Sequence, residues 1–305
     1  MAKSRIYKPT AEAIIMASDI LKKGEVVSFP TETVYGLGAD ATNSDAIAKI
    51  FSAKNRPSFN PLIIHLPNTQ MVEKYVELSQ LTKDLSNIFW PGPFTMVLPL
   101  KKNSGISTLI TAGLETVAIR VPSHPVAHTL LNEFNGPIAA PSANKSGQIS
   151  PTTAQHVDQE FGDELELIID GGPCDNGLES TIVKVVYDQL TILRPGNVTV
   201  EEIQEKIEVK IVTDTQPTDN PIAPGQLKSH YAPNANVRLN VINPEMNEAY
   251  LAFGDTNQVE NMLNLSPSGD LEEAASIAPI PKSGVGVAIN DRLERAAAPK
   301  DLLKD

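Results

Sequence analysis

The sequence predicts an α/β (α+β) fold in which helices pack against a large mixed sheet. Over the first two hundred residues, helical periodicity alternates with short apolar runs that are typical of strands. A chain of 305 residues with 41% hydrophobic and 20% charged residues is long enough for one large domain and a smaller one. The single cysteine, Cys174, excludes an internal disulfide, and the histidines are too scattered for a structural zinc site.

The predicted helices begin at residues that commonly cap a helix. Thr10 is the expected N-cap of the first helix, which ends at Gly24. A second helix is expected from Ser44, with Ile47 and Ile50 on one face. Further helices fit residues 124–134, 152–161 and 288–298.

The predicted strands are short apolar runs bounded by polar or turn segments. They cover residues 26–29, 61–66, 95–100, 116–121, 138–140, 167–170, 181–186 and 190–193, with later ones at 237–241 and 250–253. Residues 213–236 are rich in Pro, Thr, Asp and Asn, which indicates an extended linker. We therefore expect a first domain over 1–212, a linker over 213–236 and a small C-terminal α/β domain over 237–305.

The net charge of −12 argues against an extended surface for nucleic acid, because nonspecific binding to phosphates needs Lys and Arg. A few basic residues inside one pocket could still attract an anionic ligand. The sequence contains neither a signal-peptide pattern nor an apolar run of membrane-spanning length. A cytoplasmic location without membrane attachment is therefore expected.

Polar side chains follow the end of the first predicted strand, in the run FPTETVYGLG over 29–38. Thr31, Thr33 and Tyr35 could face a ligand crevice at this strand end. A capped turn is an equal alternative, since Thr and Gly are ordinary turn residues.

Basic residues form a second candidate site. Lys54 and Arg56 precede Pro57 and Pro61, which keep the chain extended, and the two cations suit a triphosphate. A solvated loop is the alternative for an isolated pair of this kind. His65 follows in an apolar run, where a lone histidine is more often a core residue than a catalyst.

Arg120 lies inside an apolar predicted strand, where an unpaired guanidinium would be costly. It should therefore face either a structural acid or the carboxylate of a ligand. The run PSANKSG over 141–147, together with Ser180 and Arg194, again places polar residues at strand ends, and plain turns or caps are the alternative. The sequence contains no P-loop, no dinucleotide fingerprint, no nucleophile elbow and no HExxH motif, so a nucleotide would need an unusual site.

Taken in order, these motifs resemble those of the YrdC-like family of threonylcarbamoyl-AMP synthases, in the long form with an extra C-terminal domain. The resemblance runs over FPTETVYGLGADA, KNRPSFNPLIIH, FWPGPFTMVL, VAIRVPSHP, APSANKSGQISPT, GLESTIV and LRPG, and extends to PGQLKSHYAP at 224–233 and AINDRL at 288–293. It implies a YrdC-like twisted mixed sheet with a large concave cavity. It also implies a small Rossmann-like C-terminal domain, shortened here near residues 271–281.

The resemblance further implies an activity. The family condenses L-threonine, bicarbonate or CO2, and ATP with Mg2+ into threonylcarbamoyl-AMP and pyrophosphate, for modification of adenosine 37 in tRNA by a downstream threonylcarbamoyl transferase. Mg2+ would be carried by the ATP phosphates rather than by protein side chains, and direct binding of tRNA would be weak.

The same resemblance assigns residues to the two substrates. The ATP site would comprise Lys54, Arg56, Asn60, Thr116, Ser142, Asn144, Ser150, Arg194 and Tyr231, with Lys54 and Arg56 as the catalytic pair. The L-threonine site would comprise Thr31, Thr33, Tyr35, His65, Arg120, Ala140 and Ser180. The linker, with Lys228 and Tyr231, resembles a lid that keeps water from the labile product.

Two other functions fit parts of this pattern. A double-stranded RNA-binding module is the non-enzymatic alternative, although the acidic composition weighs against it. A carbamoyl-transfer domain like that of hydrogenase-maturation proteins is the third, but the acylphosphatase and zinc-finger modules of those proteins do not occur in this sequence.

Overall fold

The chain folds around one large mixed sheet, as predicted. The computed structural model describes residues 5–186, 189–227, 239, 250–252, 262–264 and 283–297. The sheet has eleven strands in the order β1-β8-β2-β3-β7-β4-β6-β5-β9-β10-β11, with parallel and antiparallel neighbours, and a separate pair is formed by β12 and β13. The strands are β1 (Ile6–Tyr7), β2 (Val27–Phe29), β3 (Gly36–Asp40), β4 (Ile63–His65), β5 (Phe94–Pro99), β6 (Thr116–Arg120), β7 (Ile138–Ala139), β8 (Ile168–Ile169), β9 (Thr181–Val186), β10 (Gln189–Arg194), β11 (Lys210–Thr213), β12 (Tyr250–Ala252) and β13 (Met262–Asn264).

Helices begin where capping side chains occur. Thr10 caps α1 as predicted, its hydroxyl accepting from the Ala13 amide, and α2 begins at Ser44 after the Asn43 cap. The helices are α1 (Ala11–Lys22), α2 (Ser44–Lys54), α3 (Thr69–Tyr75), α4 (Gln80–Phe89), α5 (Thr108–Thr111), α6 (Pro125–Phe134), α7 (Ala154–Phe161), α8 (Val200–Lys206) and α9 (Val285–Ala296), with a 3-10 turn at Gly162–Glu164.

Several elements were not predicted. Strand β3 contains two glycines, which disfavour a strand, yet it is hydrogen-bonded between β2 and β7, so pairing outweighs local preference. Helices α3, α4 and α8 are also additional, and for α4 the four-residue spacing of Leu81, Leu85 and Phe89 was a usable signal. The predicted strand at 237–241 and the shortened region at 271–281 lie outside the described residues, apart from Leu239.

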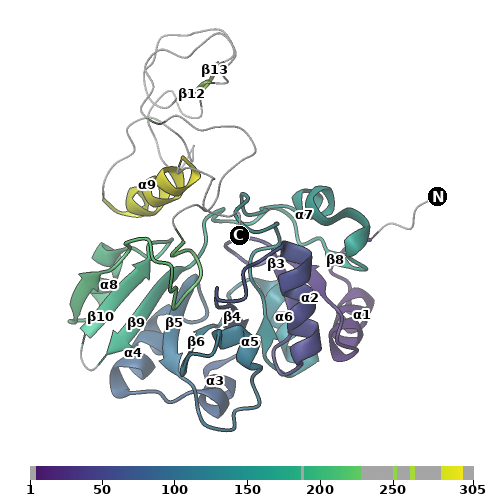
Figure 1. The fold of residues 1–305 in the computed structure, drawn as a ribbon, viewed down its shortest axis with the longest axis horizontal. Helices are drawn as coiled ribbons and strands as arrows, with labels where there is room; N and C mark the ends of the chain where they lie inside the picture. The colour runs from purple at the N-terminus through teal and green to yellow at the C-terminus, as the bar shows by residue number, and fades with distance from the viewer. Residues whose placement is uncertain are drawn as a thin grey trace.

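Helices cover both faces of the sheet (Figure 1). On one face, α1 and α6 lie side by side and pack on Val27 and Phe29 of β2. The larger core on the other face contains Leu37 of β3, Ile64 of β4 and Ile119 of β6, covered by helices that include α2 and α4.

The central strands leave part of one face for a site. In β4 and β6, Ile64 and Ile119 point into the larger core, while their neighbours Ile63 and Ala118 join a small cluster with Ala223. Because successive side chains in a strand alternate between faces, the next residues, His65 and Arg120, lie on the face of this small cluster. His65 and Arg120 are register partners in parallel strands, so two polar side chains meet at adjacent strand ends.

The segment predicted as a linker covers the same face. Ala223 is fully buried in the small cluster, and Ile222 packs against it. Strand β11 runs to Thr213 and pairs with β10, one residue beyond the predicted boundary at 212, and that boundary stays a prediction.

Gly196 is expected to be essential for the local packing. A Cβ atom there would lie 2.4 Å from the Thr181 amide nitrogen and 2.5 Å from the Glu179 carbonyl oxygen, and backbone atoms of a paired strand cannot move aside cheaply. Gly196→Ala should therefore lower the free energy of unfolding by about 2–3 kcal/mol, measured by urea denaturation.

The matched control for this variant is Gly105→Ala. Gly105 has φ +78° but no atom within 4 Å of the added Cβ, so only backbone strain of about 1 kcal/mol is expected. Equal stability of Gly196→Ala and wild type would contradict the proposed close approach.

Candidate functional site

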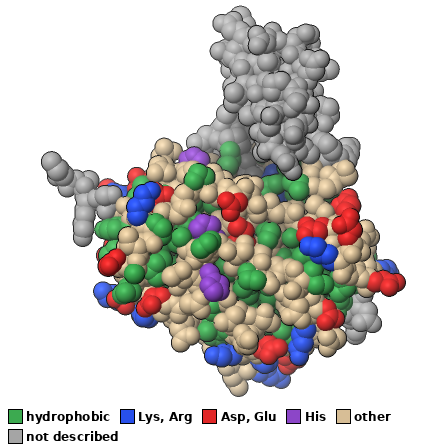
Figure 2. Space-filling view, turned by 180° about the vertical axis from the view of Figure 1, so that it is seen from behind, with side chains coloured by type: hydrophobic (Ala, Val, Ile, Leu, Met, Phe, Trp, Pro, Cys, Tyr) green, Lys and Arg blue, Asp and Glu red, His purple; other side chains and the backbone are tan. Residues whose placement is uncertain are grey.

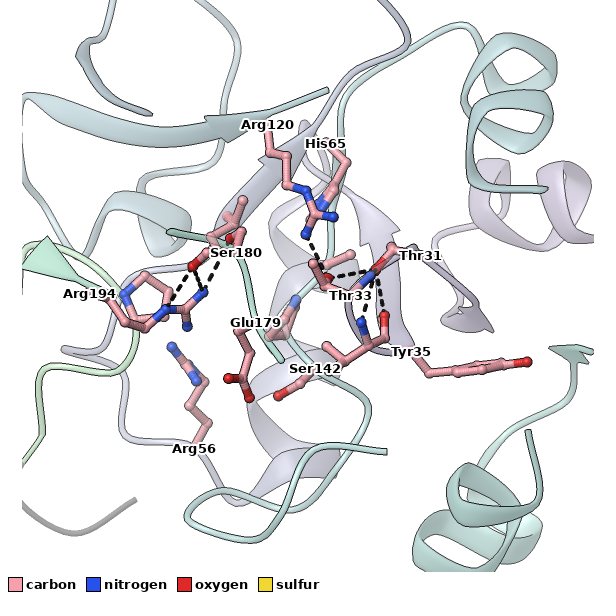
Figure 3. Close-up of a pocket in the computed structure, with 16 residues that line it drawn as sticks. Thr31, Thr33, Tyr35, Arg56, His65, Arg120, Ser142, Glu179, Ser180 and Arg194 are labelled. Atoms are coloured by element: carbon pink, nitrogen blue, oxygen red, sulfur yellow. Dashed lines mark hydrogen bonds between the residues drawn. The ribbon is translucent and has the colours of Figure 1, made fainter. Parts of the chain in front are cut away.

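One cavity opens on the same face of the sheet as the small cluster, beside it (Figure 3). Its walls come from eight separate stretches of sequence. The lining residues are Thr31, Thr33, Val34, Tyr35, Gly36, Arg56, Ile63, His65, Arg120, Ala140, Pro141, Ser142, Glu179, Ser180, Arg194 and Pro224.

Backbone hydrogen bonds join the stretch around residues 31–36 to the stretch around residues 140–142. The Leu37 amide donates to the Pro141 carbonyl at 2.8 Å, and the Ala143 amide donates to the Tyr35 carbonyl at 2.8 Å. Gly36 and Ser142 form a β-bridge between these two contacts. The polar run after β2 and the polar run after β7 are therefore held as neighbours.

The turn at 31–34 is both a capped turn and a wall of the cavity. The Thr31 hydroxyl accepts from the Thr33 and Val34 amides and donates to the Val34 carbonyl at 2.7 Å, so it is occupied by the turn itself. The Thr33 hydroxyl lies 2.9 Å from the Thr31 hydroxyl and accepts from Arg120. The two alternatives that the sequence left open for this run, a ligand-facing strand end and a capped turn, are thus compatible.

Tyr35 directs its hydroxyl away from the other labelled residues (Figure 3). The phenol donates to the Gly172 carbonyl at 2.7 Å, and burial, followed by the nearby Asp170 carboxylate, raises the pKa of Tyr35. The phenol is therefore protonated and anchors the 170–172 segment, while the rest of the residue lines the cavity.

Arg120 is buried and pairs with an acid. Its Nη2 lies 2.7 Å from Glu32 Oε1, its Nη1 donates to Thr33 Oγ1 at 2.9 Å and its Nε donates to the Gly92 carbonyl at 3.1 Å. Burial, the largest single influence, would raise the pKa of Glu32, but the charge of Arg120 and the hydrogen bonds from Arg120 and from backbone amides together hold that pKa below its usual value. Arg120 thus faces a structural acid and also lines the cavity, so neither alternative from the sequence excludes the other.

His65 lies beside Arg120 and is neutral. Burial, followed by the positive charge of Arg120, lowers the pKa of His65 to about 3. Its Nδ1 has no hydrogen-bond partner among the described residues. A buried ring nitrogen without a partner is costly, and it marks a position where a ligand or water can bind.

Two arginines line the opposite part of the cavity. Arg194 donates from Nε and Nη2 to the Ser180 carbonyl, at 3.2 and 2.9 Å, and from Nη2 to the Ser180 hydroxyl. Arg56 donates from Nε to the Asn60 carbonyl and from Nη2 to the Pro61 carbonyl. Figure 3 shows both guanidinium groups turned toward the same part of the cavity, with the Glu179 carboxylate beside them.

Lys54 occupies a different position from Arg56. Its amino group is buried and donates to the Ser142 carbonyl at 2.6 Å and to the Asn144 carbonyl. Burial, followed by the charge of Arg56, holds the pKa of Lys54 well below its usual value. Lys54 thus lies behind the 142–144 loop, and the catalytic role inferred from resemblance stays a prediction.

The structure brings together all seven predicted threonine residues and three of the predicted ATP residues, Arg56, Ser142 and Arg194. Outside the lining lie Lys54, Asn60, Asn144, Ser150 and Thr116. Asn60 is fully buried with both side-chain amide atoms unpartnered in the described part of the chain, and Ser150 donates to Glu179.

Thr116 does not share the cavity with Arg120. It begins β6, and Arg120 ends it, so roughly 13 Å of extended chain separates them. Thr116 is therefore not part of the lining of this cavity, and its place in the nucleotide site, carried over from the resemblance, stays a prediction. Tyr231 and Lys228 lie outside the described residues.

Two acids were not assigned from the sequence although both line or border the cavity. Glu32 pairs with Arg120, and Glu179 pairs with Arg292 of α9. The signal for Glu32 was the rule that a buried guanidinium needs a partner, since Glu32 was the acid within the first polar run. No sequence signal links Glu179 to Arg292, because 113 residues separate them.

Neither a membrane helix nor a metal cluster occurs among the described residues. None of their helices is long and apolar enough to span a bilayer. No group of three or more His, Cys, Asp or Glu side chains lies within metal-binding distance in the same part of the chain.

The neutral state of His65 predicts a pH dependence of stability. Below pH 6.5 the unfolded chain binds a proton at His65 that the folded chain does not bind until about pH 3, so stability falls as the pH drops. Between pH 8 and pH 4.5, wild type should lose roughly 2.7 kcal/mol more than His65→Asn, measured by chemical denaturation. Parallel pH profiles for the two proteins would contradict a neutral His65.

Two family models match this chain. The Sua5–YciO–YrdC model, described as telomere recombination, matches residues 19–196. A second model, described as the C-terminal domain of threonylcarbamoyl-AMP synthase, matches residues 198–278.

Individual relatives agree with these models. The chain is 46% identical over 235 residues to a threonylcarbamoyl-AMP synthase of Bacillus subtilis, covering 76% of this chain and 68% of the relative. It is 44% identical over 228 residues to the enzyme of that name from Pyrococcus abyssi, covering 73% of this chain and 66% of the relative. It therefore spans about two-thirds of the length of these relatives.

A solved structure agrees as well. The crystal structure of P. abyssi Sua5 complexed with L-threonine matches with a TM-score of 0.82 and 34% identity, covering 93% of this chain and 94% of that one. Since the first family model alone matches more than half of the sequence, the chain belongs to the Sua5–YciO–YrdC family, in the long form that carries the C-terminal domain of threonylcarbamoyl-AMP synthases.

Proposed function

We propose that this chain is an L-threonylcarbamoyladenylate synthase of the cytoplasm. It condenses L-threonine, bicarbonate or CO2, and ATP into threonylcarbamoyl-AMP and pyrophosphate. A downstream threonylcarbamoyl transferase then uses the product to modify adenosine 37 of tRNA. The observation that carries the proposal is a single cavity with a buried Arg120, a neutral His65 and hydroxyls on one side, and Arg56 and Arg194 on the other.

The first side of the cavity suits an α-amino acid. The Arg120 guanidinium has five N–H groups and uses some of them on Glu32, Thr33 and Gly92, so others can donate to a carboxylate. Because Glu32 balances the charge of Arg120, this ion pair is neutral before a carboxylate binds. The unpartnered nitrogen of His65 can accept a hydrogen bond from an amine or a hydroxyl.

The other side suits phosphates. Arg56 and Arg194 are held by backbone carbonyls, which fixes their planes before a ligand arrives, and planar guanidinium groups bind phosphate oxygens in pairs. Ser142 and the backbone around it can contact the rest of the nucleotide. As the resemblance implies, Mg2+ would be held by phosphate oxygens and would offset their charge.

The reaction then needs alignment more than proton transfer. The threonine nitrogen attacks the carbon of CO2 and loses a proton, which gives a carbamate. A carbamate oxygen attacks the α-phosphorus of ATP, the bond to the bridging oxygen breaks and pyrophosphate leaves. Arg56 and Arg194 would stabilise the charge that builds on the pyrophosphate.

An RNA-binding module remains a weaker alternative. Lys and Arg side chains are interspersed with Asp and Glu on the face shown in Figure 2, and the chain is acidic overall. A basic stripe is what binding to a phosphate backbone would require.

The direct test is mass spectrometry of a mixture of protein, ATP, Mg2+, threonine and bicarbonate. A product with the mass of threonylcarbamoyl-AMP is expected, and its formation should require every component. If pyrophosphate is released without threonine, or no adenylate forms, the proposed reaction is wrong.

Arg56 should be needed for turnover. Arg56→Ala is expected to lower threonine-dependent pyrophosphate release at least about 100-fold, because one charged partner of the leaving group is lost. Arg56→Lys keeps the charge but loses the planar fork, so an intermediate rate is expected. Lys102→Ala removes an exposed cation and serves as the control. Normal turnover of folded Arg56→Ala would remove Arg56 from the mechanism.

Arg120 should be needed for threonine. Removing Arg120 alone would leave Glu32 buried and unpaired, at a cost of about 3–5 kcal/mol in stability, so we choose the neutral double variant Glu32→Gln/Arg120→Gln. This variant should bind threonine at least about 10-fold more weakly by calorimetry while it still binds an ATP analogue. Glu32→Gln is the matched control, and unchanged threonine affinity in the double variant would contradict the assignment.

A further inference from the structure

A carboxylate borders the part of the cavity that suits phosphates. Glu179 lines the cavity next to Arg56 and Arg194, and only 7% of the residue is exposed (Figure 3). A triphosphate placed beside this carboxylate would be repelled, and the repulsion is larger in a buried site than in water. A site for ATP therefore needs a way to neutralise Glu179 and to fix its direction.

The C-terminal helix supplies a partner for this carboxylate. Arg292 of α9 places its Nε 3.0 Å from Glu179 Oε2, and Arg292 is itself 9% exposed. The other carboxylate oxygen, Oε1, accepts from the Ser150 hydroxyl. Both oxygens of Glu179 thus have a donor, and one of these donors comes from the far end of the chain.

The same helix is tied to the segment that covers the cavity. Asp291 lies 3.0 Å from both Arg292 Nη1 and Arg295 Nε, which aligns the two guanidinium groups. Arg295 donates from Nη1 to the Leu227 carbonyl at 2.6 Å and from Nη2 to the Thr215 carbonyl at 3.0 Å. These carbonyls lie on either side of Pro224, which lines the cavity.

We propose that Arg292 is a positioning residue of the nucleotide site, which acts by neutralising Glu179 so that phosphates can lie beside Arg56 and Arg194. This inference rests on the proposed function, because it requires ATP in this cavity. It gives α9 a role in substrate binding through charge, in addition to its role in packing.

The variants separate charge from packing. Arg292→Gln removes the charge but keeps a side chain of similar polarity, and Arg292→Lys restores the charge. Glu179→Gln removes the carboxylate that Arg292 is proposed to neutralise. Arg295→Gln removes a neighbouring contact of the same helix without touching Glu179, so it is the matched control for docking of α9.

The readout is the Kd of the Mg2+ complex of β,γ-methylene-ATP, measured by calorimetry at low and high ionic strength. Arg292→Gln should weaken binding about 10-fold at low ionic strength, and Arg292→Lys should bind close to wild type. The double variant Glu179→Gln/Arg292→Gln should bind as tightly as Glu179→Gln alone, since the carboxylate that Arg292 is proposed to neutralise is gone. Any loss of affinity in Arg295→Gln should persist when Glu179→Gln is added.

Three results would overturn the inference. In the first, Arg292→Gln binds the analogue with the same Kd as wild type. In the second, the double variant Glu179→Gln/Arg292→Gln binds it as weakly as Arg292→Gln. In the third, adding Glu179→Gln restores the affinity of Arg295→Gln as well as it restores that of Arg292→Gln. These outcomes differ from failure of the proposed function, in which wild type itself would neither bind the analogue nor release pyrophosphate with threonine.

Discussion

The site depends on one constraint, which is that the loops among its walls contain buried backbone carbonyls that accept hydrogen bonds from basic side chains. Buried carbonyls without donors are costly, so side chains must supply the hydrogen bonds. Lys54 donates to residues 142 and 144, Arg56 to residues 60 and 61, and Arg194 to residue 180. Arg295 serves the covering segment in the same way at residues 215 and 227. The long basic side chains that hold the loops also give the site its shape.

This constraint explains how an acidic protein can offer a binding site for anions. Arg56 and Arg194 donate to neutral carbonyls, which fixes the direction of their charges, and a low-dielectric wall strengthens the field in the cavity. Arg120 differs because Glu32 balances its charge, and burial, followed by the charge of Arg120, lowers the pKa of the adjacent His65 so that it stays neutral. The cavity therefore has a part with net positive charge and a part with little, which matches a molecule that is polyanionic at one end.

Local sequence was enough to predict the elements that carry most of these residues. Thr10 and Ser44 mark helix starts correctly, and the apolar runs that contain His65 and Arg120 are strands. Strand β3 was missed because its pairing with β2 and β7 is a long-range property that its glycines hide. Membership of the site was harder to predict, since Lys54 and Arg56 are two residues apart in sequence, yet one faces the back of a loop and the other faces the cavity. The role of a basic side chain here depends on which carbonyl lies within reach, and that is decided by tertiary structure.

The buried pairs also show why the resemblance to a family could not replace the geometry. A motif identifies which residues recur, but the energetic role of each depends on its neighbours. Arg120 cannot be removed alone without leaving a buried carboxylate, whereas a variant of the whole pair removes the guanidinium without that penalty. Glu179 and Arg292 obey the same rule across two distant segments, so the charge state of the cavity is set jointly by the sheet and by the C-terminal helix. Because a buried charge and its partner act as a unit, Arg292 of the C-terminal helix contributes to the electrostatic field of the site, as the residues in its walls do.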